Sequence, residues 1–227
     1  IGFAIPSNMV RVVTESARSG VGHIRMPWIG VRLQEVTPDI AEGLGLAAPS
    51  GALVAEVAPG SPAERAGITT GDLIVSIEGV AVPDPSSVNY RLATKGIGAS
   101  VSVGVMRGGE DYAATLALEA APETVPRDEL DIAGYSPFTG AKVLNLSPAV
   151  AEELAYPGRP EGVIVRGVAA GSFAAEAGLR PGDVVREVNG VAFASTRQLA
   201  EISSGDVRRW QVVIERNGRL IRSQFRG

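Results

Sequence analysis

The stretch APGSPAERAGITTGDLIVSIEGVAV, at residues 58–82, returns as AAGSFAAEAGLRPGDVVREVNGVAF at residues 169–193. Its glycines, several alanines and one aspartate recur in register, whereas the charged positions between them differ. Residues that set backbone turns are therefore kept while the surface varies. Such a repeat specifies a fold, and it predicts two copies of one domain.

The match extends well beyond this stretch. WIGVRLQEVTPDIAEGLGL, at residues 28–46, matches FTGAKVLNLSPAVAEELAY, at residues 138–156, and each copy ends in a hairpin-like pair of apolar stretches. A length of 227 residues leaves one large domain or two of about 100 residues equally open, and the repeat decides for two. We expect the copies to span residues 26–120 and 134–227. The joint APETVPRDELDIA, at residues 121–133, has two prolines and several charges and is predicted to be an exposed linker.

Short local signals predict the same elements in both copies. Thr37 and Ser147 each precede a proline, which is typical of a helix N-cap, and Gly67 and Gly178 are predicted as left-handed helix ends. Further turn glycines are predicted at Gly71, Gly79, Gly182 and Gly190. Helical spacing in DPSSVNYRLAT and ASTRQLAEIS predicts the longest helix of each copy. Each copy is therefore expected to be a small, β-rich α+β domain with several short strands and two helices.

The composition excludes several classes of function. The net charge is −4, from 21 basic and 25 acidic residues, and no run of lysine or arginine marks a phosphate-binding surface, so nucleic acid is not expected as a partner. The chain has no cysteine, which removes disulfides, thiol catalysis and cysteine-ligated metals. No apolar run reaches the roughly 20 residues that cross a bilayer. The start, IGFAIPSNMV, lacks an initiating methionine and a signal-like segment, so we expect a piece of a longer protein.

The repeat also resembles a known family. GALVAEVAPGSPAERAGITTGDLIVSIEGVAV, at residues 51–82, is similar to the core of bacterial PDZ domains, and the tandem resembles the C-terminal half of the HtrA/Deg serine proteases. A single AGLRPGD motif would fit any PDZ protein, including tandem-PDZ intramembrane metalloproteases. IGFAIPSN favours HtrA/Deg, because it resembles the last strand and the start of the closing helix of the trypsin-like domain in that family. The resemblance implies two tandem PDZ domains, as small partly open β-barrels or sandwiches with two helices each, after a protease-domain remnant at residues 1–25.

The chain by itself is not expected to be an enzyme. Its only histidine, His23, lies in the glycine-containing stretch SGVGHIRMP and is predicted to be an ordinary exposed linker residue. No serine lies in a G-x-S-x-G or GNSGG-like setting, and a serine without a base is a poor nucleophile. An H-E-x-x-H zinc motif is also absent, so no catalytic residue, metal site or cofactor is predicted. By the resemblance, the triad of a trypsin-like endopeptidase would lie in a domain outside this chain.

The resemblance implies a peptide-binding site in each copy. A PDZ domain adds an extended peptide as a strand to a sheet edge and holds its C-terminal carboxylate with backbone N–H groups. The residues that match the carboxylate-binding loop are Trp28, Ile29, Gly30 and Val31 in the first copy, and Phe138, Thr139, Gly140 and Ala141 in the second. Those that would line the groove are Val31, Leu33, Val88 and Leu92, and then Ala141, Val143, Leu199 and Ile202. All the groove residues are apolar, so a ligand ending in a hydrophobic residue is expected, with a dissociation constant near micromolar, about −8 kcal/mol.

Structural interpretations stand beside these assignments. Turn glycines and turn-capping aspartates explain Gly67, Gly71 and Asp72, with Gly178, Gly182 and Asp183, as parts of the fold. The apolar helix positions fit the core as well as a groove floor, because periodicity does not separate the two. In the second loop, TGA replaces the bulkier IGV, and second domains of the family often serve assembly or regulation. The second loop is therefore the weaker candidate.

Two functions remain for the chain. The leading hypothesis is the peptide-binding module of a periplasmic HtrA-like protease and chaperone in protein quality control, which captures hydrophobic C-termini or unfolded segments for its own protease domain. The alternative is a structural module that mediates oligomer assembly or regulates the protease, without strong binding of a terminus. The fragment is expected to be monomeric and the parent trimeric or larger, because trimerisation in this family uses the protease domain.

Overall fold

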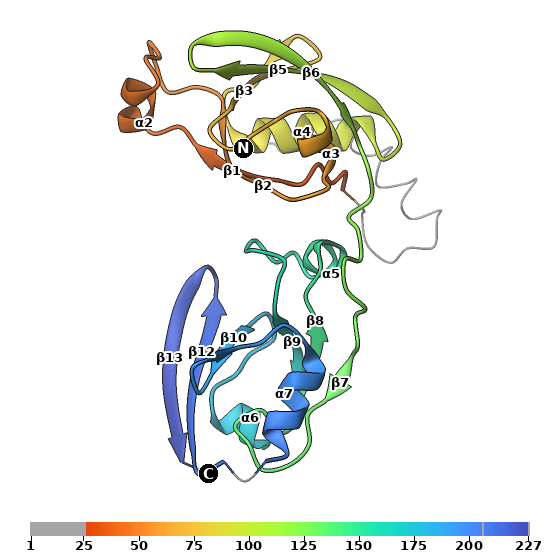
Figure 1. Ribbon diagram of the computed structural model, residues 1–227, viewed down its shortest axis with the longest axis vertical. Helices are drawn as coiled ribbons and strands as arrows, with labels where there is room; N and C mark the ends of the chain where they lie inside the picture. The colour runs from red at the N-terminus through yellow and green to blue at the C-terminus, as the bar shows by residue number, and fades with distance from the viewer. Residues whose placement is uncertain (1–25, 206, 227) are drawn as a thin grey trace, which may run out of the picture. The chain divides into compact units, whose positions relative to one another are not determined.

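The computed structural model describes residues 26–205 and 207–226, and the chain divides after Ala121 into two compact units. The first unit ends at Ala121 and the second begins at Pro122. In the described residues, each unit is built around one antiparallel sheet with three helices (Figure 1). The sequence predicted two helices per copy. The third is the single helical turn after Ser61 and after Ser172, which the sequence predicted to end at Gly67 and Gly178.

Some of the sequence predictions concern the start of the chain. The protease-domain remnant at residues 1–25, together with His23, lies outside the described residues. Within the described part, no helix is long and apolar enough to cross a bilayer, and no cluster of three or more histidine, aspartate or glutamate side chains is placed to hold a metal ion.

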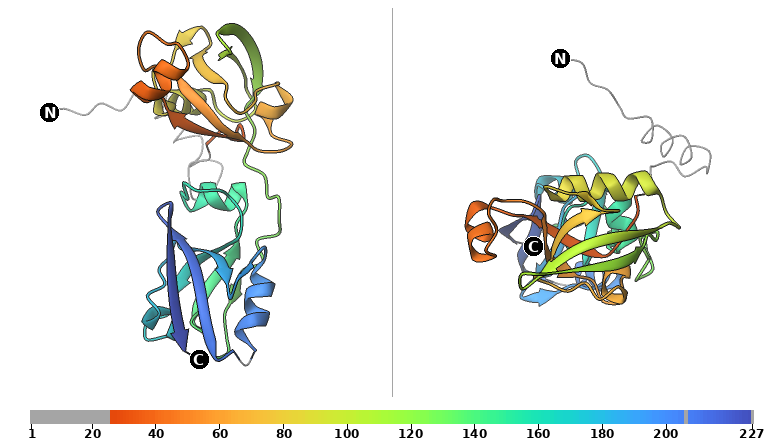
Figure 2. Two further views of the ribbon diagram at one scale, coloured as in Figure 1. Left: turned by 60° about the vertical axis from the view of Figure 1, so that its left-hand side comes forward. Right: turned by 90° about the horizontal axis from the view of Figure 1, so that it is seen from above.

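The first unit has a sheet with the strand order β1-β2-β3-β5-β6, and β4 pairs with β3. Its strands are β1 (Val31–Glu35), β2 (Ala52–Val57), β3 (Leu73–Ile77), β4 (Val80–Ala81), β5 (Ser100–Arg107) and β6 (Glu110–Ala117). Its helices are α2 (Pro38–Gly43), α3 (Pro62–Arg65) and α4 (Pro85–Lys95). The long helix α4 lies across the curved sheet and contacts β1, β2 and β3 (Figure 2).

The second unit repeats this topology and adds one strand. Its strands are β7 (Leu130–Asp131), β8 (Ala141–Asn145), β9 (Val163–Val168), β10 (Val184–Val188), β11 (Val191–Ala192), β12 (Arg209–Arg216) and β13 (Arg219–Arg226). Its helices are α5 (Pro148–Glu153), α6 (Phe173–Glu176) and α7 (Thr196–Ser203). The order is β13-β12-β10-β9-β8-β7, so β7 covers the edge of β8, the strand that corresponds to β1.

The predicted caps and turns are confirmed. The side chain of Thr37 accepts the N–H of Ile40, and that of Ser147 accepts the N–H of Val150, at the starts of α2 and α5. The helix-ending and turn glycines all have positive φ, from 72° to 94°: Gly67, Gly71, Gly79, Gly178, Gly182 and Gly190. These local signals act alike in both units because caps and turn glycines satisfy backbone requirements that do not depend on distant residues.

Each unit has its own apolar core. In the first unit, Val88 and Leu92 of α4 pack with the inner faces of the strands and are 0% and 2% exposed. In the second unit, Leu199 of α7 is fully buried with Phe138 and Trp210, whose rings meet edge to face at 6.2 Å. Val88, Leu92 and Leu199 therefore contribute to the two cores, and their predicted contact with a peptide remains a prediction.

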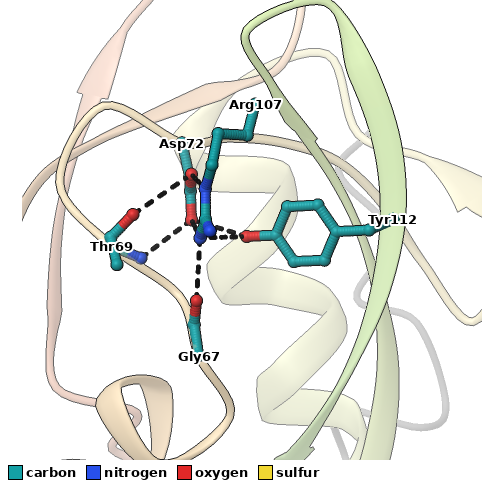
Figure 3. A network of polar contacts seen from close by, with 5 residues as sticks. All are labelled: Gly67, Thr69, Asp72, Arg107 and Tyr112. Atoms are coloured by element: carbon teal, nitrogen blue, oxygen red, sulfur yellow. Dashed lines mark hydrogen bonds and ion pairs between the residues drawn. The ribbon is translucent and has the colours of Figure 1, made fainter.

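A buried aspartate ties the turn after α3 to the last hairpin of the first unit (Figure 3). Asp72 is fully buried and accepts the N–H of Thr69 at 2.8 Å, which is the predicted turn cap. Its two carboxylate oxygens also accept from Arg107, at 2.6 and 2.8 Å, and one accepts from the hydroxyl of Tyr112 at 2.6 Å. Arg107 in turn donates to the carbonyl of Gly67 at 2.8 Å. The network holds the turn against β5 and β6.

This network changes the proton affinity of its members. Burial acts to raise the pKa of Asp72, but hydrogen bonds from Arg107, Thr69 and Tyr112 outweigh it and lower the pKa from 3.8 to about 2. Burial and the neighbouring carboxylate raise the pKa of Tyr112 to about 12. Asp72 is therefore ionised at neutral pH and part of the fold, as the structural interpretation predicted.

The second unit has an equivalent aspartate–arginine network around Asp183. Asp183, 1% exposed, accepts the N–H of Arg180 at 2.8 Å and is held by Arg216 at 2.6 and 2.7 Å. Arg216 also donates to the carbonyl of Gly178 at 2.8 Å. The aspartates were recognisable in the sequence, whereas their arginine partners, 35 and 33 residues away, were not.

The structure differs from the sequence prediction in the joint at residues 121–133. From Pro122 onward this stretch belongs to the second unit, and it contains β7. Ile132 is only 3% exposed and lies in the core with Leu130 packed against it. The prolines and charges of the joint concealed the alternation of Leu130, Asp131 and Ile132, which is the period of a strand.

Candidate peptide-binding sites

The first predicted loop, residues 28–31, is fixed to the beginning of α3. The carbonyl of Ile29 accepts the N–H of Ala63 at 3.0 Å, and the carbonyl of Gly30 accepts the N–H of Ala58 at 2.8 Å. Gly30 has φ +75°, and a Cβ there would lie 2.1 Å from the Cβ of Ser61. Only glycine fits this position, and with the carbonyls tied down the amides of the loop face the other way.

The second predicted loop, residues 138–141, has the same construction. The carbonyl of Thr139 accepts the N–H of Ala174 at 3.0 Å, and that of Gly140 accepts the N–H of Ala169 at 2.9 Å. Gly140 has φ +88°, and a Cβ there would lie 2.4 Å from the Cβ of Ser172. The repeat therefore preserves the loop and its anchor, although the side chains in the two loops differ.

The first loop leads into an open sheet edge. Among the described residues, β1 pairs with β2 alone, and the amides of Ile29 and Gly30 have no hydrogen-bond partner. Val31 lies opposite Val57 next to the bond from Ala58 to Gly30, so the N–H and C=O of Val31 point away from β2 toward the open edge. Backbone donors without partners therefore converge at the start of an unpaired edge, which is an arrangement that can hold an anion.

The second loop leads into a paired edge. The N–H of Ile132 donates to the carbonyl of Ala141 at 2.8 Å, and the N–H of Gly140 donates to the carbonyl of Ile132 at 2.9 Å. The amide of Thr139 donates to Ser136 at 3.1 Å, and that of Ala141 to Phe138 at 2.9 Å. The donors that are unpartnered in the first loop are all used within the second unit.

The apolar side chains on the open edge are more exposed than those on the paired edge. Val31 and Leu33 on β1 are half-buried and pack only against the margin of the core. Their counterparts on β8, Ala141 and Val143, are 0% exposed because β7 covers them. The first unit thus offers apolar surface beside its loop, and the second has filled that surface with its own chain.

The other predicted site residues also differ in burial between the two units. Trp28 is half-buried and Ile29 is 6% exposed beside the first loop, whereas Phe138 is fully buried behind the second. On α7, Ile202 is half-buried at the margin of the core. Contact of any of these residues with a ligand remains a prediction. What sequence reasoning missed is the segment around β7.

Each of the two edge strands, β1 and β8, carries one basic residue. In the second unit, Lys142 on β8 lies 3.3 Å from Glu129 and 3.5 Å from Asp131, and these carboxylates raise its pKa. In the first unit, Arg32 takes the position of Lys142 and pairs with Glu56 of the neighbouring strand at 2.9 Å. A cation next to the edge can attract an acidic group of an added strand.

Comparison with known proteins agrees with this architecture. Models of the PDZ domain match residues 27–118 and residues 164–209. The two units are therefore PDZ domains in tandem, and the predicted fold class of mainly β structure is confirmed. We call them the first and the second PDZ domain below.

The relatives of the chain extend the assignment. A probable periplasmic serine endoprotease DegP-like of Pseudomonas putida (strain W619) is 31% identical over 89% of this chain and 43% of that protein. One of Rhizobium meliloti (strain 1021) is 35% identical over 83% of this chain and 37% of that protein. A solved structure, the HtrA-type protease AlgW with decapeptide, is 33% identical with a TM-score of 0.44, over 54% of this chain and 37% of that one. The chain belongs to the HtrA/Deg family, and it spans less than half the length of these curated relatives.

Proposed function

We propose that the first PDZ domain binds the C-terminus of a peptide as an added strand along β1. The observation that carries the proposal is the unpaired edge of β1 beside the unpartnered amides of Ile29 and Gly30. The terminal carboxylate would accept these two N–H groups and that of Val31. Each such charge-assisted bond contributes about 1.5–3 kcal/mol, and ordering of the peptide opposes them, so a micromolar dissociation constant is expected.

The ligand of this site would be hydrophobic at its end. Val31 and Leu33 provide half-buried apolar surface along the edge, and Ile29 lines the loop. Side chains of an added strand alternate between the sheet faces, so the last residue and the one two positions earlier would contact this surface. Hydrophobic C-termini of unfolded proteins have this chemistry.

In the whole protein, this site would serve a protease. The curated relatives are named periplasmic serine endoproteases, and we assign the parent chain to the periplasm with a trypsin-like catalytic domain beyond these two domains. The tandem domains would hold C-termini of unfolded proteins for that domain, while this chain by itself would not cleave peptides. Assembly of protomers is the competing function if no terminus binds.

Calorimetric titration tests the site. A peptide with a hydrophobic residue and a free carboxylate at its end should bind, and the amidated peptide should bind at least about tenfold more weakly, a loss of 1.4 kcal/mol or more. Val31→Pro removes one edge-facing N–H without a ladder bond and should weaken binding of the free peptide more than binding of the amidated one. Equal affinities for the two peptides would refute carboxylate binding at this loop.

A further inference from the structure

Residues 127–132, which we call the inserted segment, run along β8 as a PDZ ligand would. The segment is antiparallel to β8: the N–H of Asn145 donates to the carbonyl of Arg127 at 2.7 Å, and Leu130 lies opposite Val143. At the other end, the carbonyl of Ile132 accepts the N–H of Gly140 in the loop at 2.9 Å. Ile132 thus takes the position that the proposed site of the first domain assigns to a terminal residue.

The side chains of the inserted segment alternate in chemistry. Leu130 and Ile132 point into the core that contains Leu199 of α7. Asp131 lies between them with 77% of its side chain exposed, 3.5 Å from Lys142. Glu129, on the same face as Asp131, lies 3.3 Å from Lys142 and 2.9 Å from Arg166. The site therefore accommodates an apolar, an acidic and an apolar residue in succession, and its own cations face the acids.

The far end of the inserted segment is clamped to α7. Asp128 pairs with Arg197 at 2.7 Å, and its carbonyl accepts the hydroxyl of Thr196 at 2.9 Å. The amide side chain of Asn145 donates to the carbonyl of Pro126 at 2.8 Å. The segment is therefore held by both elements, β8 and α7, that border a PDZ peptide site.

The inserted segment differs from a free peptide ligand because it has no terminal carboxylate. The chain continues past Ile132 and turns back at Gly134, where φ is +104° and a Cβ would lie 2.6 Å from the carbonyl oxygen of Ser203. The loop thus receives a neutral carbonyl oxygen instead of a carboxylate. A free C-terminus would form the stronger, charge-assisted bond, while the tethered segment competes at a local concentration on the order of millimolar.

From these contacts we propose that the second PDZ domain is a second peptide site, specific for C-termini with an apolar–acidic–apolar sequence, and that the inserted segment occupies it as a tethered ligand. A free peptide of this class enters only when the segment leaves. The apparent affinity is therefore reduced by the fraction of molecules in which the site is open.

The probe for this proposal is the peptide RDELDI, the sequence of residues 127–132 with a free carboxylate. In a Val31→Pro background, which weakens the first site, amide NMR signals of Gly140 and Ala141 report binding at the second. The segment contacts both residues: the N–H of Gly140 donates to the carbonyl of Ile132, and the carbonyl of Ala141 accepts the N–H of Ile132. Leu130→Ser removes an apolar contact of the segment, and Asp131→Lys places a second cation opposite Lys142, so both should raise the affinity for RDELDI at least tenfold.

A disulfide that holds the inserted segment on β8 tests the opposite case, in which the segment cannot leave. Asp131 and Lys142 are directly opposite each other, and the bonds of Ile132 place them in a non-hydrogen-bonded pair, where Cα atoms are about 4.5 Å apart. The chain has no cysteine, so the double variant Asp131→Cys, Lys142→Cys forms a single defined bridge. Oxidation should abolish the binding of RDELDI to the second domain, and reduction should restore it.

The outcomes separate a ligand from a structural strand. The peptide RKKLKI, with lysines at the three acidic positions, is the matched control and should bind at least tenfold more weakly than RDELDI. Equal binding before and after oxidation would overturn the proposal. The proposal would also be overturned if the Leu130→Ser or Asp131→Lys protein folded but did not bind RDELDI. The same holds if both variants unfolded and the unmodified protein did not bind RDELDI. Binding is read from amide signals of the second domain. A first domain that binds no peptide would therefore not change this result, and the two proposals are tested separately.

Discussion

The two PDZ domains of this chain share a loop and differ in what lies against it. Gly30 and Gly140 lie in equivalent loops, and in each loop two carbonyls accept N–H groups from the short helix α3 or α6 and from the residues before it. The loop of Gly30 leads into an unpaired edge strand, whereas the loop of Gly140 is bonded to the chain's own residues. Repetition of a motif therefore preserves the scaffold of a site without preserving its availability. Whether a sheet edge can receive a peptide depends on what else the fold pairs with it.

The largest expected effect concerns what the domains share. Asp72→Ala should destabilise the first domain, and Asp183→Ala the second, each by about 3 kcal/mol, because the buried carboxylate that caps the turn and holds the arginine is lost. Trp28 and Trp210 are the two tryptophans, one in each domain, so urea unfolding followed through their separate indole N–H NMR signals assigns the loss. A shift of both tryptophan signals by either variant would show that the domains do not unfold separately.

The next prediction addresses the difference between the sites. In the unmodified chain, a peptide with a free hydrophobic C-terminus should bind the first domain about 100-fold more tightly than the second, because the tethered segment competes at millimolar local concentration. Titration monitored through the amides of Gly30 and Gly140 measures both affinities in one sample. Similar affinities at the two glycines would mean that the inserted segment does not close the second site.

Acid should weaken the first domain. The pKa of Asp72 is lowered by its fold from 3.8 to about 2, so its contribution is complete above pH 4 and is lost as the pH falls toward 2. The shift corresponds to about 2 kcal/mol of unfolding free energy. Urea unfolding between pH 2 and 5, followed at Trp28, measures it, with Asp72→Asn as the control that should remove this part of the pH dependence. An unchanged slope in the control would assign the acid effect to other groups.

The smallest expected effect is a gain in stability. The hydroxyl of Ser203 is buried in the second domain and has no hydrogen-bond partner among the described residues. Ser203→Ala should therefore stabilise this domain by about 1 kcal/mol, since it removes an unsatisfied polar group. Thermal unfolding followed at Trp210 tests this, and Ser102→Ala on the exposed face of the first domain is a control expected to change little. A loss of stability in Ser203→Ala would indicate a contact of the hydroxyl that the described residues do not include.

Much of the fold was predictable because its signals are local. Proline after Thr37 and Ser147, and glycine at the ends of short helices, set the same backbone conformations wherever they occur. The glycines of the two candidate loops, Gly30 and Gly140, were also recognisable, because the repeat placed both in register. The helix positions Val88 and Leu199 were assigned to core only by the structure, since one apolar face fits core and groove alike.

The sequence by itself determined the two repeated domains, their turns, their caps and the two candidate loops. The tertiary structure decided which of the two sheet edges is paired and which is open. Leu130 to Ile132 is too short a strand to be recognised between charged residues, and its pairing with β8 depends on contacts with α7 more than 60 residues away. Caps and turns are satisfied by neighbours in the chain, whereas the pairing of a sheet edge is settled by distant residues that compete for it.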